Sequence, residues 1–88
     1  MFLHLGGDHV ITFSQVVAIF DYNLRFHSKL TRRFLEETED KGELIDVSEG
    51  NPKSFVVTTK GTYLSQISAS TLKKRGANDI AHLDNYLK

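Results

Sequence analysis

The stretch that decides the fold is FVVTTKGTYLSQI, residues 55–67. Two runs rich in β-branched and aromatic residues, 55–59 and 62–67, flank the dipeptide Lys60-Gly61. Such residues suit the pleated, half-buried surface of a sheet, and a short connection containing glycine joins antiparallel strands. The stretch therefore predicts a β-hairpin.

Further strands are predicted before this hairpin. Residues 2–5 and 9–13 flank Gly6-Gly7-Asp8 and predict an opening hairpin, and residues 43–47 predict another short strand. The run Val16-Val17-Ala18-Ile19-Phe20 is apolar without interruption. That pattern is typical of a strand covered on both faces, so we expect it to be central in the sheet.

The main helix is predicted over residues 28–41. Ser28 can cap its start, and Gly42 can end it in the left-handed conformation. The apolar face expected to cover the sheet is formed by Leu30, Phe34 and Leu35.

Two short elements are expected after the second hairpin. Ser70 or Thr71 can cap a turn that carries the basic run 73–75 and that Gly76 would stop. Asn78 can cap a terminal helix over about 78–88. So short a helix is only marginally stable in isolation, so its apolar side needs a surface to pack on. Its apolar side is formed by Ile80, Leu83 and Leu87.

These elements predict an α+β fold: a small, mostly antiparallel sheet of five or six short strands, one main helix and a short C-terminal helix. The 88 residues leave room for a single domain, 1–88, with one small core. Because the chain has no cysteine, disulfides cannot support that core. We therefore expect a homo-oligomer in which neighbouring copies complete strand edges or the sheet face.

Composition also bears on location and on partners. No long apolar run predicts a membrane span, and the first residues lack the pattern of a signal peptide, so we expect a cytoplasmic protein with no membrane partner. Eleven basic and eleven acidic residues give a formal net charge of zero. Binding to nucleic acid must therefore come from local patches of positive charge.

Catalysis and cofactor binding find little support. Asp21, His27 and Ser28 have the composition of a hydrolytic triad, but no nucleophile elbow or phosphate-binding glycine loop accompanies them. The four histidines show no i, i+3 or i, i+4 spacing, which favours packing or surface roles over metal ligation. We expect no catalytic residues, no metal and no cofactor.

Basic residues remain as candidate binding groups. Lys73-Lys74-Arg75 is the densest positive stretch, and Lys53 follows a Gly-Asn-Pro loop from which its side chain can project. The alternative for the run 73–75 is a solubilising turn with favourable charge near a helix C-terminus. So few cations per subunit bind DNA weakly, but repetition around an oligomer raises avidity.

Several segments together resemble the bacterial extracellular matrix regulator family, RemA/RemB, and most closely its short RemB branch. The similarity covers about residues 1–75 and is a collinear pattern rather than one diagnostic motif. The segments are FLHLG (2–6), VVAIFD (16–21), GELID (42–46), GNPKSFVV (50–57) and SQISASTLKKR (65–75).

The resemblance implies a compact α+β protomer that assembles into a closed ring, contacts DNA and activates biofilm matrix genes. In the RemA branch three arginines carry DNA binding; their places correspond here to about Gln15, Asn51 and Pro52. Lys53 and Arg75 therefore remain as the candidate cations, joined by the Lys73-Lys74 pair. Gly6, Gly42 and Gly50 match the family pattern and predict backbone with positive φ.

Two functions are consistent with the sequence. In one, the chain is a DNA-associated transcriptional regulator that acts as a ring and contacts double-stranded DNA through Lys53, Lys73, Lys74 and Arg75. In the other, it is a non-catalytic interaction module that co-assembles with a paralogue or another protein and does not bind DNA. The neutral net charge and the missing arginines are the reason for keeping the second as the alternative.

Overall fold

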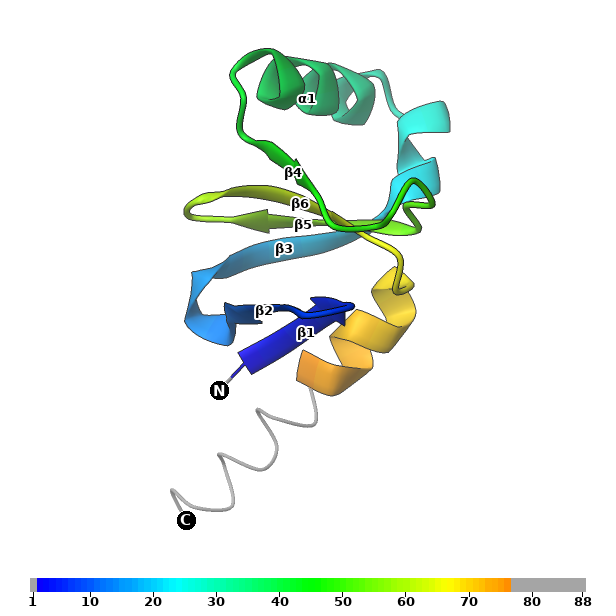
Figure 1. The fold of residues 1–88 in the computed structure, drawn as a ribbon. Helices are drawn as coiled ribbons and strands as arrows, with labels where there is room; N and C mark the ends of the chain where they lie inside the picture. Colours follow the sequence, from blue (N-terminus) through cyan, green and yellow to red (C-terminus); the bar gives the residue numbers. More distant parts are fainter. Residues whose placement is uncertain (1, 77–88) are drawn as a thin grey trace.

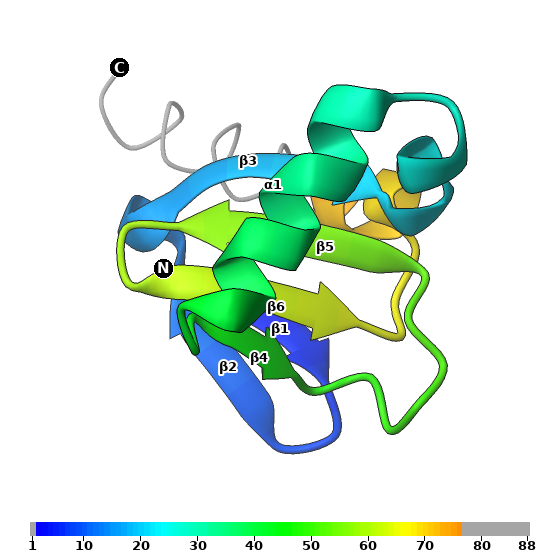
Figure 2. The same ribbon diagram turned by 90° about the horizontal axis from the view of Figure 1, so that it is seen from above.

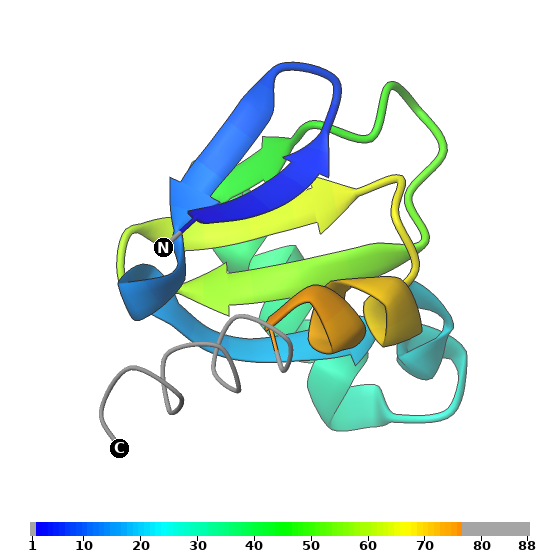
Figure 3. The same cartoon turned by 90° about the horizontal axis from the view of Figure 1, so that it is seen from below.

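The computed structural model describes residues 2–76, in which a four-stranded sheet is covered on both faces (Figure 1). Helix α1 lies across one face, as the view from above shows (Figure 2). A two-stranded hairpin and a helical segment over residues 69–76 cover the other face (Figure 3). The α+β class predicted from the sequence is confirmed.

The described chain contains six strands in two sheets. The smaller sheet pairs β1 and β2 antiparallel, and the larger has the strand order β3-β5-β6-β4. In the larger sheet the β3-β5 and β5-β6 pairs are antiparallel and the β4-β6 pair is parallel. The strands are β1 (Phe2–Gly6), β2 (His9–Thr12), β3 (Val16–Asp21), β4 (Leu44–Asp46), β5 (Ser54–Thr58) and β6 (Gly61–Ser65).

Both hairpins predicted from the sequence are confirmed. β5 and β6 pair with Phe55 opposite Leu64, and β1 and β2 pair with Leu3 opposite Ile11. The expectation of one sheet is wrong, because the opening hairpin packs face to face on the larger sheet instead of extending its edge (Figure 1).

The central position predicted for residues 16–20 is also wrong. Within residues 2–76, β3 is an edge strand that hydrogen-bonds to β5 alone, and Val17 is 65% exposed. Val16 and Ile19 pack against the core, and the Phe20 ring stacks on Phe55 with 5.1 Å between ring centroids. The apolar run is therefore covered over only part of its length and leaves apolar side chains on an open edge.

Helix α1 (Lys29–Asp40) begins and ends as predicted. The Ser28 hydroxyl accepts a hydrogen bond from the Thr31 amide at 3.2 Å, and Gly42 follows with φ 72°. Leu35 is buried, but Leu30 is 79% exposed, so the expectation that Leu30 faces the core is wrong. Leu30 lies in the first turn of α1 and borders an open groove next to β3.

Two short 3-10 helices, η1 (Phe13–Gln15) and η2 (Tyr22–Phe26), flank β3 and were not expected from the sequence. Gly6 and Gly50 have the positive φ values expected of them, 119° and 83°.

The segment 69–76 differs from its prediction in its cap. Its start is capped by Ser68, whose hydroxyl accepts from the Thr71 amide at 3.3 Å, and not by Ser70 or Thr71. Gly76 is itself helical, and the stop expected after it lies outside the described residues. Its role is close packing, because a Cβ at this position would lie 2.6 Å from Cε2 of Phe13. The terminal helix expected over 78–88 lies outside the described residues.

The core has a part on each face of the larger sheet. Beneath α1, Leu35 packs against Phe55 and Leu64. On the other face, the hairpin and the segment 69–76 bury a larger cluster formed by Leu3, Leu5, Ile11, Val47, Val56 and Leu72. Leu72 is fully buried, so the segment 69–76 is an integral layer of the fold.

Candidate nucleic-acid interface

The backbone of Lys53 is held in a fixed position directly before the interior strand β5. Its amide donates to the Ser65 carbonyl at 2.8 Å, and its carbonyl accepts from the Tyr22 amide at 3.0 Å. The residue is exposed at the start of β5, so its side chain is free to reach an anion from a well-defined backbone. The projection expected from the sequence is confirmed, although contact with DNA stays a prediction.

Lys73, Lys74 and Arg75 are exposed on the helical segment 69–76. Burial of Leu72 and Ala69 on the sheet turns this basic run outward. Arg75 also reaches the opening hairpin, where its Nη1 donates to the His4 carbonyl at 3.3 Å. The helical segment that carries the run lies on the face of the sheet opposite α1 (Figure 3).

Lys53 and the run 73–75 belong to segments that one hydrogen bond ties together. The Ser54 hydroxyl donates to the Ile67 carbonyl at 2.7 Å, which ties the start of β5 to the connection into the helical segment. Lys73 lies about 8 Å along the helix axis from Ser68, given a rise of about 1.5 Å per residue. Within residues 2–76, no hydrogen bond or ion pair links Lys53 to the run.

The three positions that correspond to family arginines lie at opposite ends of the β3-β5 pair. Gln15 precedes β3, and its carbonyl accepts from the Thr59 amide at 3.0 Å. Asn51 and Pro52 precede β5, whose Ser54 pairs with Asp21 at the far end of β3. An extended strand pair of this length separates them by about 20 Å.

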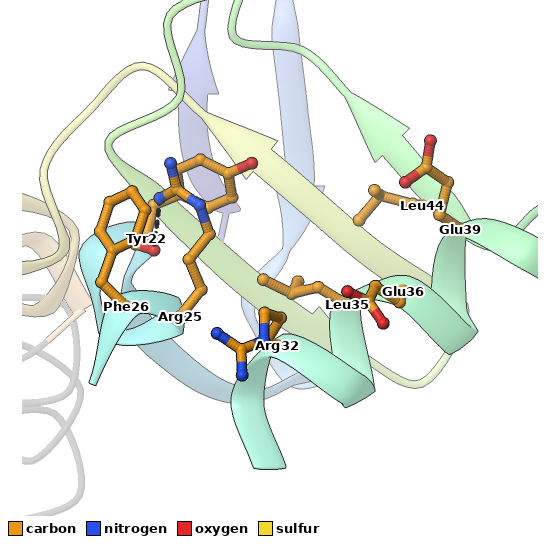
Figure 4. A pocket seen from close by; sticks show the side chains of 8 residues that line it. All are labelled: Tyr22, Arg25, Phe26, Arg32, Leu35, Glu36, Glu39 and Leu44. Carbon is orange, nitrogen blue, oxygen red and sulfur yellow. Dashed lines mark hydrogen bonds between the residues drawn. The ribbon is translucent and has the colours of Figure 1, made fainter. Parts of the chain in front are cut away.

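Sequence reasoning missed an arginine in η2. The guanidinium of Arg25 lies between two aromatic rings, with Cζ 3.8 Å from the Tyr22 centroid and 4.0 Å from the Phe26 centroid (Figure 4). Its Nη1 also donates to the Tyr22 carbonyl at 2.9 Å. The one signal in the sequence was the spacing of Tyr22 and Phe26, which a single helical turn brings to one side of Arg25.

This cluster borders a cleft of about 320 Å³ between η2 and α1. Arg32 and Glu36 project into it from α1, and Glu39 and Leu44 lie at the end away from Arg25 (Figure 4).

A separate groove of about 350 Å³ runs between β3 and α1, and its lining is almost entirely apolar. Val17 and Leu30 are largely exposed there, and Phe20 and Phe34 are partly exposed. The residues lining this β3-α1 groove include Val17, Phe20, Leu30, Phe34, Phe55 and Val57.

The triad considered from composition has structural roles instead. Asp21 Oδ1 accepts from the Asn23 amide at 2.8 Å, and Ser28 Oγ caps α1. In the part of the chain that the structure describes, no group of three or more His, Cys, Asp and Glu side chains could hold a metal ion. None of the helices over residues 2–76 is long and apolar enough to span a membrane.

Comparison with known proteins gives two matches. Residues 2–75 match the family described as RemA-like, extracellular matrix regulatory protein A-like. The chain is also 40% identical over 75 residues to a protein of Bacillus subtilis (strain 168) called extracellular matrix regulatory protein B. That alignment covers 85% of this chain and 89% of the relative, so the similarity extends over most of both proteins.

Proposed function

Because the chain belongs to the RemA-like family of extracellular matrix regulatory proteins, we propose that it is a DNA-associated transcriptional regulator of extracellular matrix (biofilm) genes. In this proposal it acts in the cytoplasm as a homo-oligomeric ring. The observation that carries the proposal is the family match over residues 2–75, the same residues that form the sheet and its covering layers.

The exposed cations support contact with DNA. Lys53, Lys73, Lys74 and Arg75 stand on ordered backbone, so little conformational entropy beyond that of the side chains is lost when they meet phosphates. Their number is small for a single subunit, and the net charge of the chain is zero. A ring that presents the same cations repeatedly along a duplex gives avidity that one subunit lacks.

The β3-α1 groove supports assembly from copies of the chain. β3 leaves one row of backbone groups unpaired in the described sheet, and Val17 and Leu30 place apolar surface next to that edge. A second apolar surface, formed by Phe2 and Val10, lies on the outer side of the opening hairpin. Contact between two different surfaces of successive copies is heterologous, and such contacts close into rings when the rotation permits.

In a second candidate function, the chain assembles in the same way but does not bind DNA. In it, the chain is a non-catalytic module that co-assembles with a paralogue or another protein partner. The occupancy of the family's arginine positions by Gln15, Asn51 and Pro52 favours this candidate, because none of the three side chains carries positive charge.

Retardation of a DNA duplex at increasing salt separates the two candidates. Binding that weakens steeply as salt rises supports the regulator, because each neutralised phosphate releases counterions. No binding even at low salt, together with recovery of a protein partner in a pull-down, supports the interaction module and contradicts direct DNA contact.

A further inference from the structure

The Arg25 side chain is held rigidly by its surroundings. The two ring contacts fix the plane of the guanidinium, and the hydrogen bond from Nη1 to the Tyr22 carbonyl fixes its rotation within that plane. A guanidinium arranged in this way loses less side-chain freedom when it binds an anion than a free surface lysine does. The site is therefore preorganised before a ligand arrives.

Within residues 2–76, most of the donors on Arg25 have no protein acceptor. A guanidinium carries five N–H donors, and one hydrogen bond, to the Tyr22 carbonyl, is made in this part of the chain. The same residues contain one ion pair with a nitrogen–oxygen distance of 4.0 Å or less, and it joins Arg33 to Glu37 at 3.9 Å. The positive charge of Arg25 is therefore not neutralised by a neighbouring carboxylate in the described fold.

Phe26 supports a binding role for the cluster. This ring is 65% exposed and lies over the guanidinium, not in the core. Stacking on aromatic rings leaves the edge of the guanidinium, which carries the N–H groups, directed away from the rings. That edge matches the planar pair of acceptors presented by a phosphate group.

Two further cations flank Arg25 from other elements. Lys53 is joined to the cluster through the hydrogen bond from the Tyr22 amide to its own carbonyl. Arg32 projects from α1 into the same cleft (Figure 4). Glu36 and Glu39 also line this cleft, and Glu39 lies at the far end from Arg25, so an anion is favoured beside η2 and disfavoured deeper along α1.

From this arrangement we infer that Arg25, clamped by Tyr22 and Phe26, binds a backbone phosphate of duplex DNA, with Lys53 and Arg32 as flanking cations. The inference rests on the proposed regulator function and extends its DNA contact onto η2. The Arg25 cluster places positive charge next to the loop that contains Asn51 and Pro52. These two residues occupy positions that correspond to arginines in the RemA branch of the family. The Arg25 cluster thus supplies a cation beside the two loop positions, Asn51 and Pro52, that carry no positive charge.

The test is fluorescence anisotropy of a labelled duplex with the full-length chain over a series of salt concentrations. Arg25→Ala is expected to bind about tenfold more weakly at low salt, because it removes a charge-assisted hydrogen bond, and to reduce the slope of log affinity against log salt by at least about 0.9. Arg25→Lys keeps the charge but not the planar stack, and is expected to recover only part of the affinity.

Arg33→Ala is the matched control, since it removes the same charge from an exposed residue already paired with Glu37. It is expected to bind like the unaltered chain. Arg32→Ala, on the exposed surface of α1, tests the flanking site without touching the aromatic clamp, and is expected to bind several-fold more weakly.

The outcomes separate this inference from the function on which it rests. If the unaltered chain binds DNA and Arg25→Ala, confirmed as folded by circular dichroism, binds with the same affinity and salt slope, the inference is wrong and the regulator function stands. If the unaltered chain does not bind the duplex at low salt, both are wrong.

Discussion

The amide of Tyr22 donates a hydrogen bond to the carbonyl of Lys53 at 3.0 Å, which joins η2 to the start of β5. Lys53 also donates to Ser65, so its backbone is held from two sides. Through this pairing, a lysine expected from the sequence to bind DNA lies beside an arginine cluster that the sequence did not predict. The two belong to one cationic edge of the molecule.

The Lys53 side chain is expected to bind one phosphate per engaged subunit. Lys53→Ala should weaken DNA binding uniformly across duplex sequences and lower the salt slope by about 0.9 for each phosphate that is no longer neutralised. Lys60→Ala is the control, because Lys60 is an exposed lysine at the opposite end of the β5-β6 hairpin. Equal losses of DNA affinity in the two variants would show that affinity depends on overall charge and not on the position of Lys53.

The basic run on the segment 69–76 is expected to bind DNA without supporting the fold. Changing Lys73, Lys74 and Arg75 together to Ala should weaken binding more than Lys53→Ala alone. The melting temperature should fall only slightly, since all three side chains are exposed and one exposed hydrogen bond, from Arg75 to the His4 carbonyl, is lost. Changing Lys29, Lys41 and Lys60 together to Ala removes the same charge from other surfaces. Unchanged DNA affinity in the 73–75 variant would assign binding to the edge that carries Lys53 and Arg25.

The β3-α1 groove is expected to lie in a contact between copies. Leu30→Glu and Val17→Glu should each reduce the oligomer mass in sedimentation, because both side chains are largely exposed in the protomer and a buried charge without a partner disfavours association. Thr59→Glu introduces the same charge on an exposed turn outside the groove and should leave the mass unchanged. An unaltered oligomer in both groove variants would place the contact elsewhere.

Leu72 is expected to anchor the helical segment that presents the basic run. Leu72→Ala truncates a fully buried side chain and should lower the free energy of unfolding by about 2–5 kcal/mol, measured by urea denaturation. Lys74→Ala, two residues further along the segment, should change it by less than about 0.5 kcal/mol. A small effect of Leu72→Ala would mean that the segment contributes little to the core.

Local signals in the sequence predicted the local structure well. The helix cap at Ser28, the stop at Gly42 and the two hairpins depend on a few adjacent residues, and all are confirmed. The position of β3 was not predictable in the same way. An uninterrupted apolar run has the same sequence pattern in a strand covered on both faces and in a strand that borders an open groove. Val17, which is largely exposed, belongs to the second kind of strand.

The candidate site was predicted in part for a similar reason. The run 73–75 is visible as a charge run and Lys53 follows a loop signal, so both were predicted as exposed cations, and both are exposed. The Arg25 clamp depends on a short 3-10 helix with no strong periodicity, and on contact between η2 and the segment that leads into β5, which is distant in sequence. Gly76 illustrates the same limit, because its packing against Phe13 depends on tertiary structure that a turn signal does not reveal.

The measurement that tests the central claim most directly is the native mass of the purified protein, with and without a duplex of about 40 base pairs, at low and at moderate salt. We expect a ring-sized oligomer that takes up DNA at low salt and releases it as salt rises. An oligomer that does not bind the duplex even at low salt would contradict the regulator function and favour the partner-binding module. A stable monomer at micromolar concentration would contradict both.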